Sequence, residues 1–215
     1  MRSLVAALAA MLPLAAAAQD CAEGLRPFTH AAGTDCIPEA PQRIVTLQDQ
    51  NGLLPLLELG VTPVASLGHV VDGRQVFRRL APGMDTSGVE WVGSYRGPID
   101  PEAIAAMSPD LIVASPFPEE APDLLDDIAP VVVIDMFDLP LTDALMQFAD
   151  LVGRTDTAEE MRAAFEAEAA EVRAALGDRL DTTTVSFNVY NPAEGTCYPV
   201  QPVQATGMGM EASGL

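Results

Sequence analysis

WVGSYRGPIDPEAIAAMSPDLIVAS, residues 91–115, reads as one loop, helix and strand unit. Asp100 is a favourable N-cap residue, and Pro101 suits the first position of a helix. The apolar run 111–114 is short and uninterrupted, as in strands buried inside a parallel sheet. Arg96 therefore stands on a loop before a helix in an α/β unit. Ligands of such folds gather in the crevice that these loops form.

The rest of the first two thirds of the chain alternates between strand-like and helix-like patterns. Apolar runs predict strands, and periodic segments ending at Gly60 and Gly153 predict helices; the strands are 44–47, 64–67, 111–114 and 131–134, and the helices 53–59 and 141–152. This alternation favours a parallel sheet flanked by helices. We therefore expect residues 19–156 to form a Rossmann-like α/β lobe.

A long helix is expected next. Thr157 and Glu160 fit a capping box, and apolar residues then recur at helical spacing up to Gly177, namely Met161, Phe165, Ala169, Val172 and Leu176. Residues 158–176 would span about 28 Å at the standard helical rise. Segment 157–178 is thus predicted to be a connecting helix.

The remaining residues, 179–215, predict only part of a second α/β lobe. Residues 184–190 and 197–200 have strand patterns, and 207–215 resembles a weak helix. The interpretation is one complete lobe, a connecting helix and an incomplete second lobe. About 200 residues suffice to bury a core of good size.

The first 18 residues have the pattern of a secretory signal peptide. Arg2 precedes an apolar core at 4–14 and three alanines before Gln19. The core is shorter than the ~20 residues that span a bilayer. Lipid attachment at Cys21 is the alternative, which Asp20 disfavours because a small residue normally precedes such a cysteine. The sequence therefore predicts export to the periplasm.

An exported chain with three cysteines favours a disulfide. Cys21 and Cys36 lie in one short, turn-rich segment, so they are the expected pair, and the residues between them suggest a small hairpin. Closing that loop would stabilise the fold by about 3 kcal/mol. Cys197 remains, and we expect it to be a buried free thiol.

The charge of the chain excludes several partners. It carries 31 acidic residues against 11 basic ones, all arginine, for a formal charge of -20. Such a surface repels nucleic acid and anionic membranes. With only two histidines, no bare metal site is expected, because zinc or manganese needs several converging His and carboxylate ligands.

Loops that follow the predicted strands supply the candidate binding residues. Gln50 and Asn51 follow the first strand and His69 the second, so their loops should open onto the same crevice as Arg96. Tyr95, beside Arg96, is expected to face the crevice, whereas Trp91 is expected in the core. Arg96 suits carboxylate or hydroxamate oxygens, because its planar fork donates paired hydrogen bonds.

Several segments together resemble the periplasmic binding proteins that deliver iron-siderophores, and related cobalamin and haem, to ABC importers. The resemblance covers about residues 28–190 and rests on PQRIV at 41–45, ELGVTPV at 58–64, VG at 92–93, PEAI at 101–104, SPDLIV at 108–113 and PDLLDDIAPV at 122–131. Members that take hydroxamate or citrate siderophores look closest, since they too carry Arg in the loop before the helix.

The resemblance implies roles for further residues and partners. Phe117 stands where the family has an aromatic wall, and Asp123 where it has a carboxylate that docks on the permease, with Glu119 and Glu120 nearby. The long helix corresponds to a rigid spine between two lobes. The implied ligand is a ferric siderophore whose iron the ligand itself chelates, so no cofactor is expected. The implied protein is a monomer that meets the membrane only through its permease.

Three other functions are alternatives to this interpretation. Cobalamin or haem are alternative ligands within the same family. A truncated product without transport activity, binding ligand weakly, is a second alternative, because the family's second lobe normally has more strands and helices. An enzyme is disfavoured, since neither a phosphate-binding glycine loop nor a nucleophile and base pair can be assembled.

Overall fold

The structure of the chain is a computed structural model. This structure describes residues 21–78, 83–180, 182, 184, 186, 188–192, 195–199 and 212. The predicted signal peptide, 1–18, and nearly all of the predicted last helix, 207–215, lie outside these residues.

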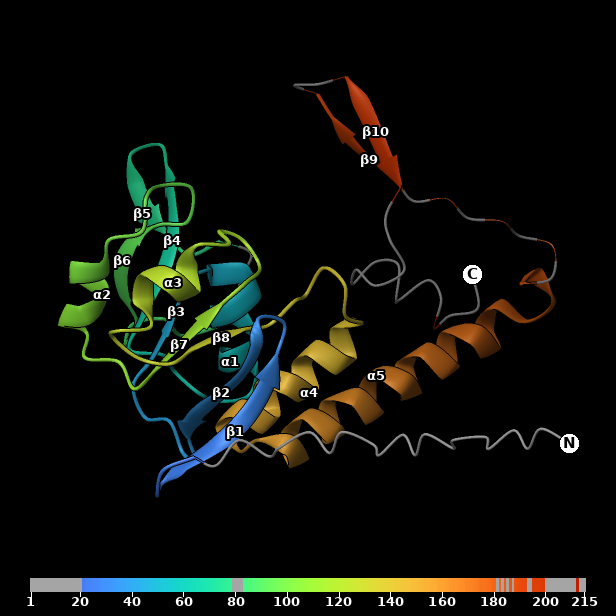
Figure 1. The fold of residues 1–215 in the computed structure, drawn as a ribbon. Coiled ribbons are helices and arrows are strands. Elements are labelled where there is room, and N and C mark those ends of the chain that lie inside the picture. Colours follow the sequence, from blue (N-terminus) through green and yellow to red (C-terminus); the bar gives the residue numbers. More distant parts are fainter. Residues whose placement is uncertain are drawn as a thin grey trace, which may run out of the picture.

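A parallel sheet forms the centre of the lobe, as the sequence predicted (Figure 1). Its parallel strands lie in the order β6 (Glu90–Ser94), β4 (Ala65–Val71), β3 (Ile44–Thr46), β7 (Leu111–Ala114) and β8 (Val131–Val133). The chain thus fills one side of β3 first and then crosses to the other side. Such an order is that of a Rossmann-like fold, and its direction reverses between β3 and β7. The Rossmann-like fold class is therefore confirmed.

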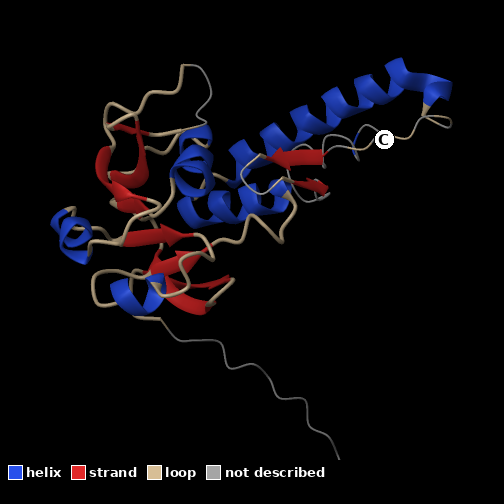
Figure 2. Ribbon diagram, turned by 90° about the horizontal axis from the view of Figure 1, so that it is seen from above, coloured by secondary structure: helices blue, strands red, loops and turns tan. Residues whose placement is uncertain are grey.

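Helices cover both faces of this sheet (Figure 2). The short helices are α1 (Leu54–Glu58), α2 (Pro101–Ala106) and α3 (Ala121–Leu125), and the longer ones are α4 (Leu141–Val152) and α5 (Thr155–Leu176). Because side chains alternate along a strand, Ile44 joins the core under α1 and α4, while Val45 joins the core under α2 and α3. The continuous apolar strands are explained by this burial on both faces.

The loop, helix and strand unit at residues 91–115 folds as its sequence indicates. Asp100 Oδ1 accepts hydrogen bonds from the backbone N–H groups of Glu102 and Ala103, both at 3.1 Å. This cap stabilises α2 by about 1 kcal/mol. The helix buries Ile104 completely against the sheet and ends before Ser108, whose φ of 49° is left-handed. The loop that carries Arg96 is consequently fixed between β6 and a capped helix.

A hairpin precedes the sheet and docks on β8. It consists of β1 (Leu25–His30) and β2 (Gly33–Pro38), and the predicted Cys21 to Cys36 disulfide ties its base, with Cα atoms 5.6 Å apart. His30 Nε2 contacts Asp35 Oδ2 at 2.7 Å, while Nδ1 accepts the N–H of Val133 at 3.1 Å. Since Nδ1 accepts, the proton of the neutral ring lies on Nε2. The hairpin and the disulfide are confirmed.

The long helix begins earlier than predicted. Gly153, in the left-handed region, ends α4, and α5 already starts at Thr155. The N–H of Ala158 bonds the carbonyl of Arg154 at 3.1 Å, so Thr157 lies inside the helix. The capping box of Thr157 and Glu160 is wrong because the two-residue connection starts the next helix at once.

One face of α5 is buried along the helix only as far as Ala169. Ala158 and Ala169 are buried, and Met161 and Phe165 are half-buried. Val172, which was predicted on the same buried face, is 45% exposed. Figure 1 shows the reason: the second half of α5 extends beyond α4 and the sheet.

The first C-terminal strand is shorter than predicted, the second is shifted by one residue, and the two pair with each other. After the short turn η2 (Gly177–Arg179), β9 (Asn188–Asn191) and β10 (Thr196–Pro199) form an antiparallel ladder. Their side chains are largely exposed. Cys197 is a free, exposed cysteine rather than the buried thiol expected, since none of the described residues covers this ladder.

The β4 strand needs a glycine where β5 (Arg74–Val76) and β6 meet it. A Cβ at Gly68 would lie 2.6 Å from the carbonyl oxygen of Val76 and 2.8 Å from Trp91 Nε1. We predict that Gly68→Ala lowers the free energy of unfolding by about 1 to 3 kcal/mol, because the backbone of β5 has to shift. Urea unfolding followed by circular dichroism measures the loss.

Gly88→Ala is the matched control, because its added methyl would lie 3.5 Å from Thr62 Cγ2, an ordinary contact. It should change stability by no more than about 0.5 kcal/mol. Equal stability of the two variants would contradict the close approach at Gly68.

Candidate functional site

The carboxyl ends of the parallel strands surround an open hollow of about 420 Å³. Its walls come from the loop after β6 and the loop after β7, and they include three of the predicted binding residues, Tyr95, Arg96 and Phe117. These loops meet because parallel strands deliver their carboxyl ends to one edge of a sheet. Arg96 and Phe117, which are 21 positions apart in the sequence, thus share one concave surface.

Each of the three side chains is available to a ligand in a different way. Arg96 is exposed on its loop, and Tyr95 is half-buried at the end of β6. Phe117 is 54% exposed, and its ring meets the ring of Phe137 edge to face, with centroids 6.0 Å apart. The hollow consequently combines one guanidinium with aromatic walls.

A buried polar cluster lies behind Tyr95, and the sequence predicted only one of its members. Asp49 is fully buried, and its two oxygens accept the backbone N–H groups of Gln50 at 2.9 Å and of Arg78 at 2.7 Å. Arg78 Nη2 donates to His69 Nε2 at 2.8 Å, and Asp49 Oδ1 lies 3.3 Å from the same nitrogen. A guanidinium can only donate, so His69 Nε2 accepts from it. We call Asp49, His69 and Arg78 the buried cluster.

The structure corrects the expected place of His69. It lies inside β4, which continues to Val71, and not in a loop after the strand. The Asp72 and Gly73 turn, with φ of 50° and 74°, folds the chain back as β5 and so lengthens β4. His69 is only 5% exposed, and its ring meets that of Tyr95 at 5.8 Å. It therefore supports Tyr95 from behind.

Gln50 and Asn51 also differ from expectation, because they lie in a helical turn and not in an open loop. The turn η1 (Asp49–Leu53) starts after a two-residue connection from the end of β3, with the N–H of Leu53 bonded to the carbonyl of Gln48 at 3.1 Å. Asn51 is buried and Gln50 is half-buried. Neither lines the hollow beside Arg96.

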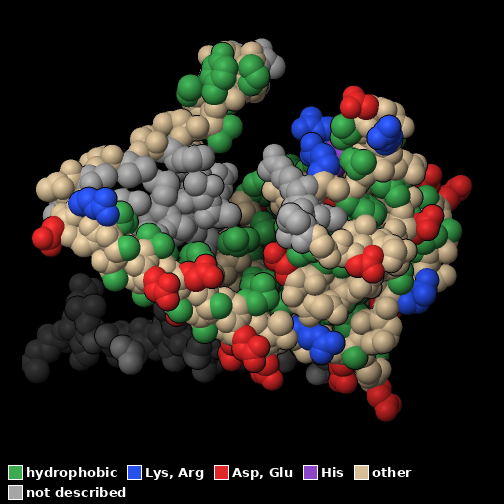
Figure 3. All heavy atoms as spheres, turned by 180° about the vertical axis from the view of Figure 1, so that it is seen from behind, with side chains coloured by type: hydrophobic (Ala, Val, Ile, Leu, Met, Phe, Trp, Pro, Cys, Tyr) green, Lys and Arg blue, Asp and Glu red, His purple; other side chains and the backbone are tan. Residues whose placement is uncertain are grey.

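Positive charge gathers at the end of the molecule where the β4 and β5 hairpin lies. Figure 3 shows arginine side chains next to a histidine there, with an acidic side chain beside them and further acidic side chains over the rest of this face. In a chain of formal charge -20, such a group of guanidinium groups makes this end of the lobe locally more positive than the rest.

The acidic residues expected to dock on a permease surround the start of α3. Asp123 is exposed in its first turn, and Glu119 and Glu120 are exposed just before it. Glu120 lines the hollow beside Arg96, whereas Glu119 lines a neighbouring hollow between the β1 and β2 turn and Pro122. The three carboxylates therefore share one region of the surface.

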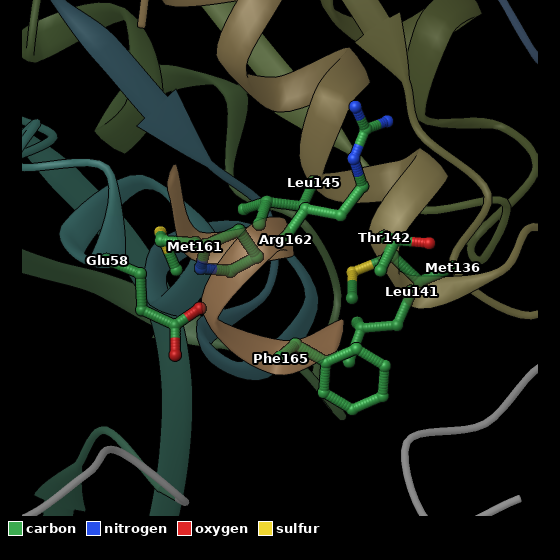
Figure 4. Close-up of a pocket in the computed structure, with 9 residues that line it drawn as sticks. Glu58, Met136, Leu141, Thr142, Leu145, Met161, Arg162 and Phe165 are labelled. Atoms are coloured by element: carbon green, nitrogen blue, oxygen red, sulfur yellow. The ribbon is translucent and has the colours of Figure 1, made fainter. Parts of the chain in front are cut away.

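A more apolar hollow, of about 220 Å³, lies between α1, α4 and α5 (Figure 4). Figure 4 shows Met136, Leu145, Met161 and Phe165 around it, with Glu58 at its margin. Partial burial raises the pKa of the Glu58 carboxyl above its usual range. Arg162 also lines this hollow, but none of the binding residues that the sequence predicted does, so it is not the candidate site.

Two kinds of feature are absent from the described part of the chain. Within residues 21–78, 83–180 and the short C-terminal pieces, no three His, Cys, Asp or Glu side chains are grouped to hold a metal ion. In the same residues, no helix has the length and apolar composition needed to cross a membrane.

The sequence interpretation missed Asp49, Arg78 and Phe137. Asp72 and Gly73 were a usable signal for Arg78, because this dipeptide between apolar strands favours a two-residue hairpin turn. That turn pairs Val76 with His69 and so returns Arg78 to the end of the sheet. No comparable pattern indicates Phe137.

Comparisons with known proteins agree with this geometry. Residues 82–209 match the periplasmic binding protein family. The ferric enterobactin-binding periplasmic protein FepB of Escherichia coli O6:H1 (strain CFT073) is 27% identical over 209 residues, covering 93% of this chain and 64% of the relative. The chain thus spans less than two thirds of that relative's length.

Solved structures have the same fold. Staphylococcus aureus SirA complexed with staphyloferrin B is 26% identical, with a TM-score of 0.63, over 76% of this chain and 56% of that one. Holo-ViuP is 22% identical, with a TM-score of 0.72, over 88% of this chain and 64% of that one.

The buried cluster should be important for stability as well as for placing the site. We predict that Asp49→Ala lowers the free energy of unfolding by about 1 to 3 kcal/mol, because two backbone N–H groups lose their acceptor inside the protein. Urea unfolding measures this loss.

Asp127→Ala removes an exposed carboxylate and serves as the control. A loss no greater than that of the control would show that water or other groups satisfy these donors and that Asp49 does not hold the cluster.

Proposed function

Because this chain belongs to the periplasmic binding protein family, we propose that it captures a ferric siderophore at the carboxyl edge of its sheet and delivers it to an ABC permease. The observation that carries the proposal is the convergence of Tyr95, Arg96 and Phe117 on one open hollow. The relatives support this ligand class, because FepB is a ferric enterobactin-binding protein and SirA was solved in complex with staphyloferrin B.

The chemistry of the hollow suits a chelated ion better than a bare one. A siderophore occupies the coordination sphere of iron with its own oxygens, and so needs only hydrogen-bond donors and apolar walls from the protein. Arg96 supplies a planar fork of donors for those oxygens, and Tyr95 and Phe117 supply flat surfaces. No resident cofactor takes part in this proposal.

The remaining parts of the molecule have proposed roles in the same cycle. Asp123, with Glu119 and Glu120, would dock on arginines of the permease, and the protein would reach the membrane only through that contact. A secretory signal at 1–18 would bring the chain to the periplasm, where FepB is found. Residues 19–156 would act as the first lobe, and α5 as the connection to a second, with the protein working as a monomer.

Arg96 provides the direct test. We predict that Arg96→Ala weakens binding of ferric enterobactin by about 1.5 to 3 kcal/mol, the range for hydrogen bonds to charged groups. Arg96→Lys should restore only part of the loss, because an ammonium group cannot make the planar fork. Isothermal titration calorimetry of the exported chain measures both.

Arg154→Ala is the charge-matched control, since Arg154 is exposed at the turn between α4 and α5. It should leave the affinity unchanged. If the Arg96 variants bind as tightly as the unaltered chain, the ligand sits elsewhere.

A further inference from the structure

His69 Nε2 faces two groups of opposite hydrogen-bonding character. Arg78 Nη2 lies 2.8 Å from this nitrogen and can only donate, whereas the carboxylate oxygen Asp49 Oδ1 lies 3.3 Å from it and can only accept. The neutral ring, with its proton on Nδ1, accepts the hydrogen bond from Arg78. A protonated ring would carry a hydrogen on Nε2 as well, so it would donate to Asp49 and could no longer accept from Arg78. The protonation state of the ring therefore decides which partner this nitrogen bonds.

The burial of the cluster makes this choice consequential. Asp49 is fully buried and His69 is 5% exposed, so water does not readily replace a lost partner. Asp49 is also fixed in place, because its two oxygens accept the backbone N–H groups of Gln50 at 2.9 Å and of Arg78 at 2.7 Å. A protonated ring would face the Arg78 guanidinium across 2.8 Å, where two positive charges repel each other strongly. The two side chains cannot both keep their positions when the ring is charged.

The guanidinium of Arg78 has few other partners to hold it. Its Nε is a buried atom without a hydrogen-bond partner, and in the part of the chain that the structure describes no carboxylate lies within ion-pair distance of the guanidinium. The guanidinium of Arg43, in contrast, donates to the backbone carbonyls of Met107 and Ser108. Loss of the acceptor on His69 would therefore release the Arg78 side chain.

A ring contact carries this change to the hollow. The His69 and Tyr95 rings meet edge to face, with centroids 5.8 Å apart and an interplanar angle of 61°, and Tyr95 lines the hollow beside Arg96. The N–H of Tyr95 bonds the carbonyl of Gly68 at 2.8 Å, so the backbone of Tyr95 is tied to the residue before His69. Its side chain is then the part that can respond to a tilt of the imidazole. His69 does not line the hollow itself, so any effect on a ligand passes through Tyr95.

The titratable and charged groups that contact His69 come from three elements. Among the described residues they are Asp49 on η1, Arg78 after β5 and Tyr95 at the end of β6. Val76, which stands opposite His69 in the ladder with β5, is uncharged. Histidine is the side chain that ordinarily changes its charge between about pH 5 and 8. His69 is thus the member of this group that can respond to pH in that range.

We propose that His69 is a positioning residue that holds Tyr95 for the ligand only while its ring is neutral, so that the hollow binds more weakly as the pH falls. This inference rests on the proposed function and adds a regulation of the same site. The neutral ring accepts from Arg78 and supports Tyr95 edge to face. The charged ring turns to Asp49, repels Arg78 and withdraws that support. The chain would bind its ligand at neutral pH and release it more readily in acid.

The test compares affinities for ferric enterobactin at about pH 8 and about pH 5.5, which bracket the ordinary titration of histidine. His69→Gln keeps an acceptor for Arg78 but gains no proton in this range. A change that belongs to the complex itself would be the same in both chains, so the variant supplies the baseline. The ratio of the two affinities should be about fivefold larger for the unaltered chain than for His69→Gln, at the lower end of couplings between sites. Isothermal titration calorimetry measures the affinities.

Two further variants separate this effect from a merely structural one. His30→Gln replaces the other histidine of the chain, which bonds Asp35 and Val133, and should keep the pH ratio of the unaltered chain. Tyr95→Ala should weaken binding at both pH values, because it removes a wall of the hollow. It should also reduce the pH ratio to that of His69→Gln, because His69 acts through this ring.

A measurement without ligand tests the contact between the two rings by itself. Nuclear magnetic resonance of the chain with isotope-labelled tyrosine and histidine follows both rings during a pH titration. The signal of Tyr95, one of three tyrosines, is identified by its loss in Tyr95→Phe, and that of His69 by its persistence in His30→Gln. The Tyr95 signal should shift together with that of His69.

The outcomes distinguish this inference from the function on which it rests. If the unaltered chain binds the complex with the same pH ratio as His69→Gln, the regulation is overturned and the proposed function stands. A pH ratio that is lost in His30→Gln or kept in Tyr95→Ala would also overturn it, as would a Tyr95 signal that does not follow His69. If the unaltered chain binds the complex at neither pH, the proposed function fails, and the regulation falls with it.

Discussion

Parallel pairing of β3 with β4 on one side and β7 on the other is the constraint on which the candidate site depends. It turns the carboxyl ends of the strands to one edge, and the loops that follow them then enclose a single crevice. Because both faces of the sheet are buried, β7 and β8 consist of apolar residues alone. The position of Arg96 is thus a consequence of core packing at residues that never touch a ligand.

The distribution of charged side chains adds a second feature to this geometry. The chain is strongly acidic, yet the hairpin after β4 and the loop after β6 present guanidinium groups at the same end. This arrangement requires a fully buried carboxylate, that of Asp49, which accepts the backbone N–H of Arg78. A rigid local cation in an acidic protein can attract an anionic chelate without attracting nucleic acid along the whole surface. The acidic residues near α3 remain free for a proposed permease contact.

The sequence predicted the parts of the fold that depend on local patterns. Apolar runs located the strands, the Asp100 cap located α2, and the short interval between Cys21 and Cys36 identified the disulfide. It failed where tertiary context decides: α5 starts before Thr157 because Gly153 ends α4 abruptly, and Arg78 reaches the site only through the hairpin turn. That Tyr95, Arg96 and Phe117 share one hollow was foreseeable from topology, whereas the contact of Phe117 with Phe137 was not. Their binding role stays a prediction.

The most direct measurement uses the single tryptophan of the chain, Trp91. It lies in β6, shortly before Tyr95 and Arg96, so a coloured ferric complex bound in the hollow should quench its fluorescence by energy transfer. We predict that ferric enterobactin quenches this fluorescence until one complex is bound per chain. The decrease should exceed the decrease that the same absorbing complex causes in a solution of free tryptophan. A linear change identical to that of free tryptophan would contradict a ferric siderophore site at this edge of the sheet.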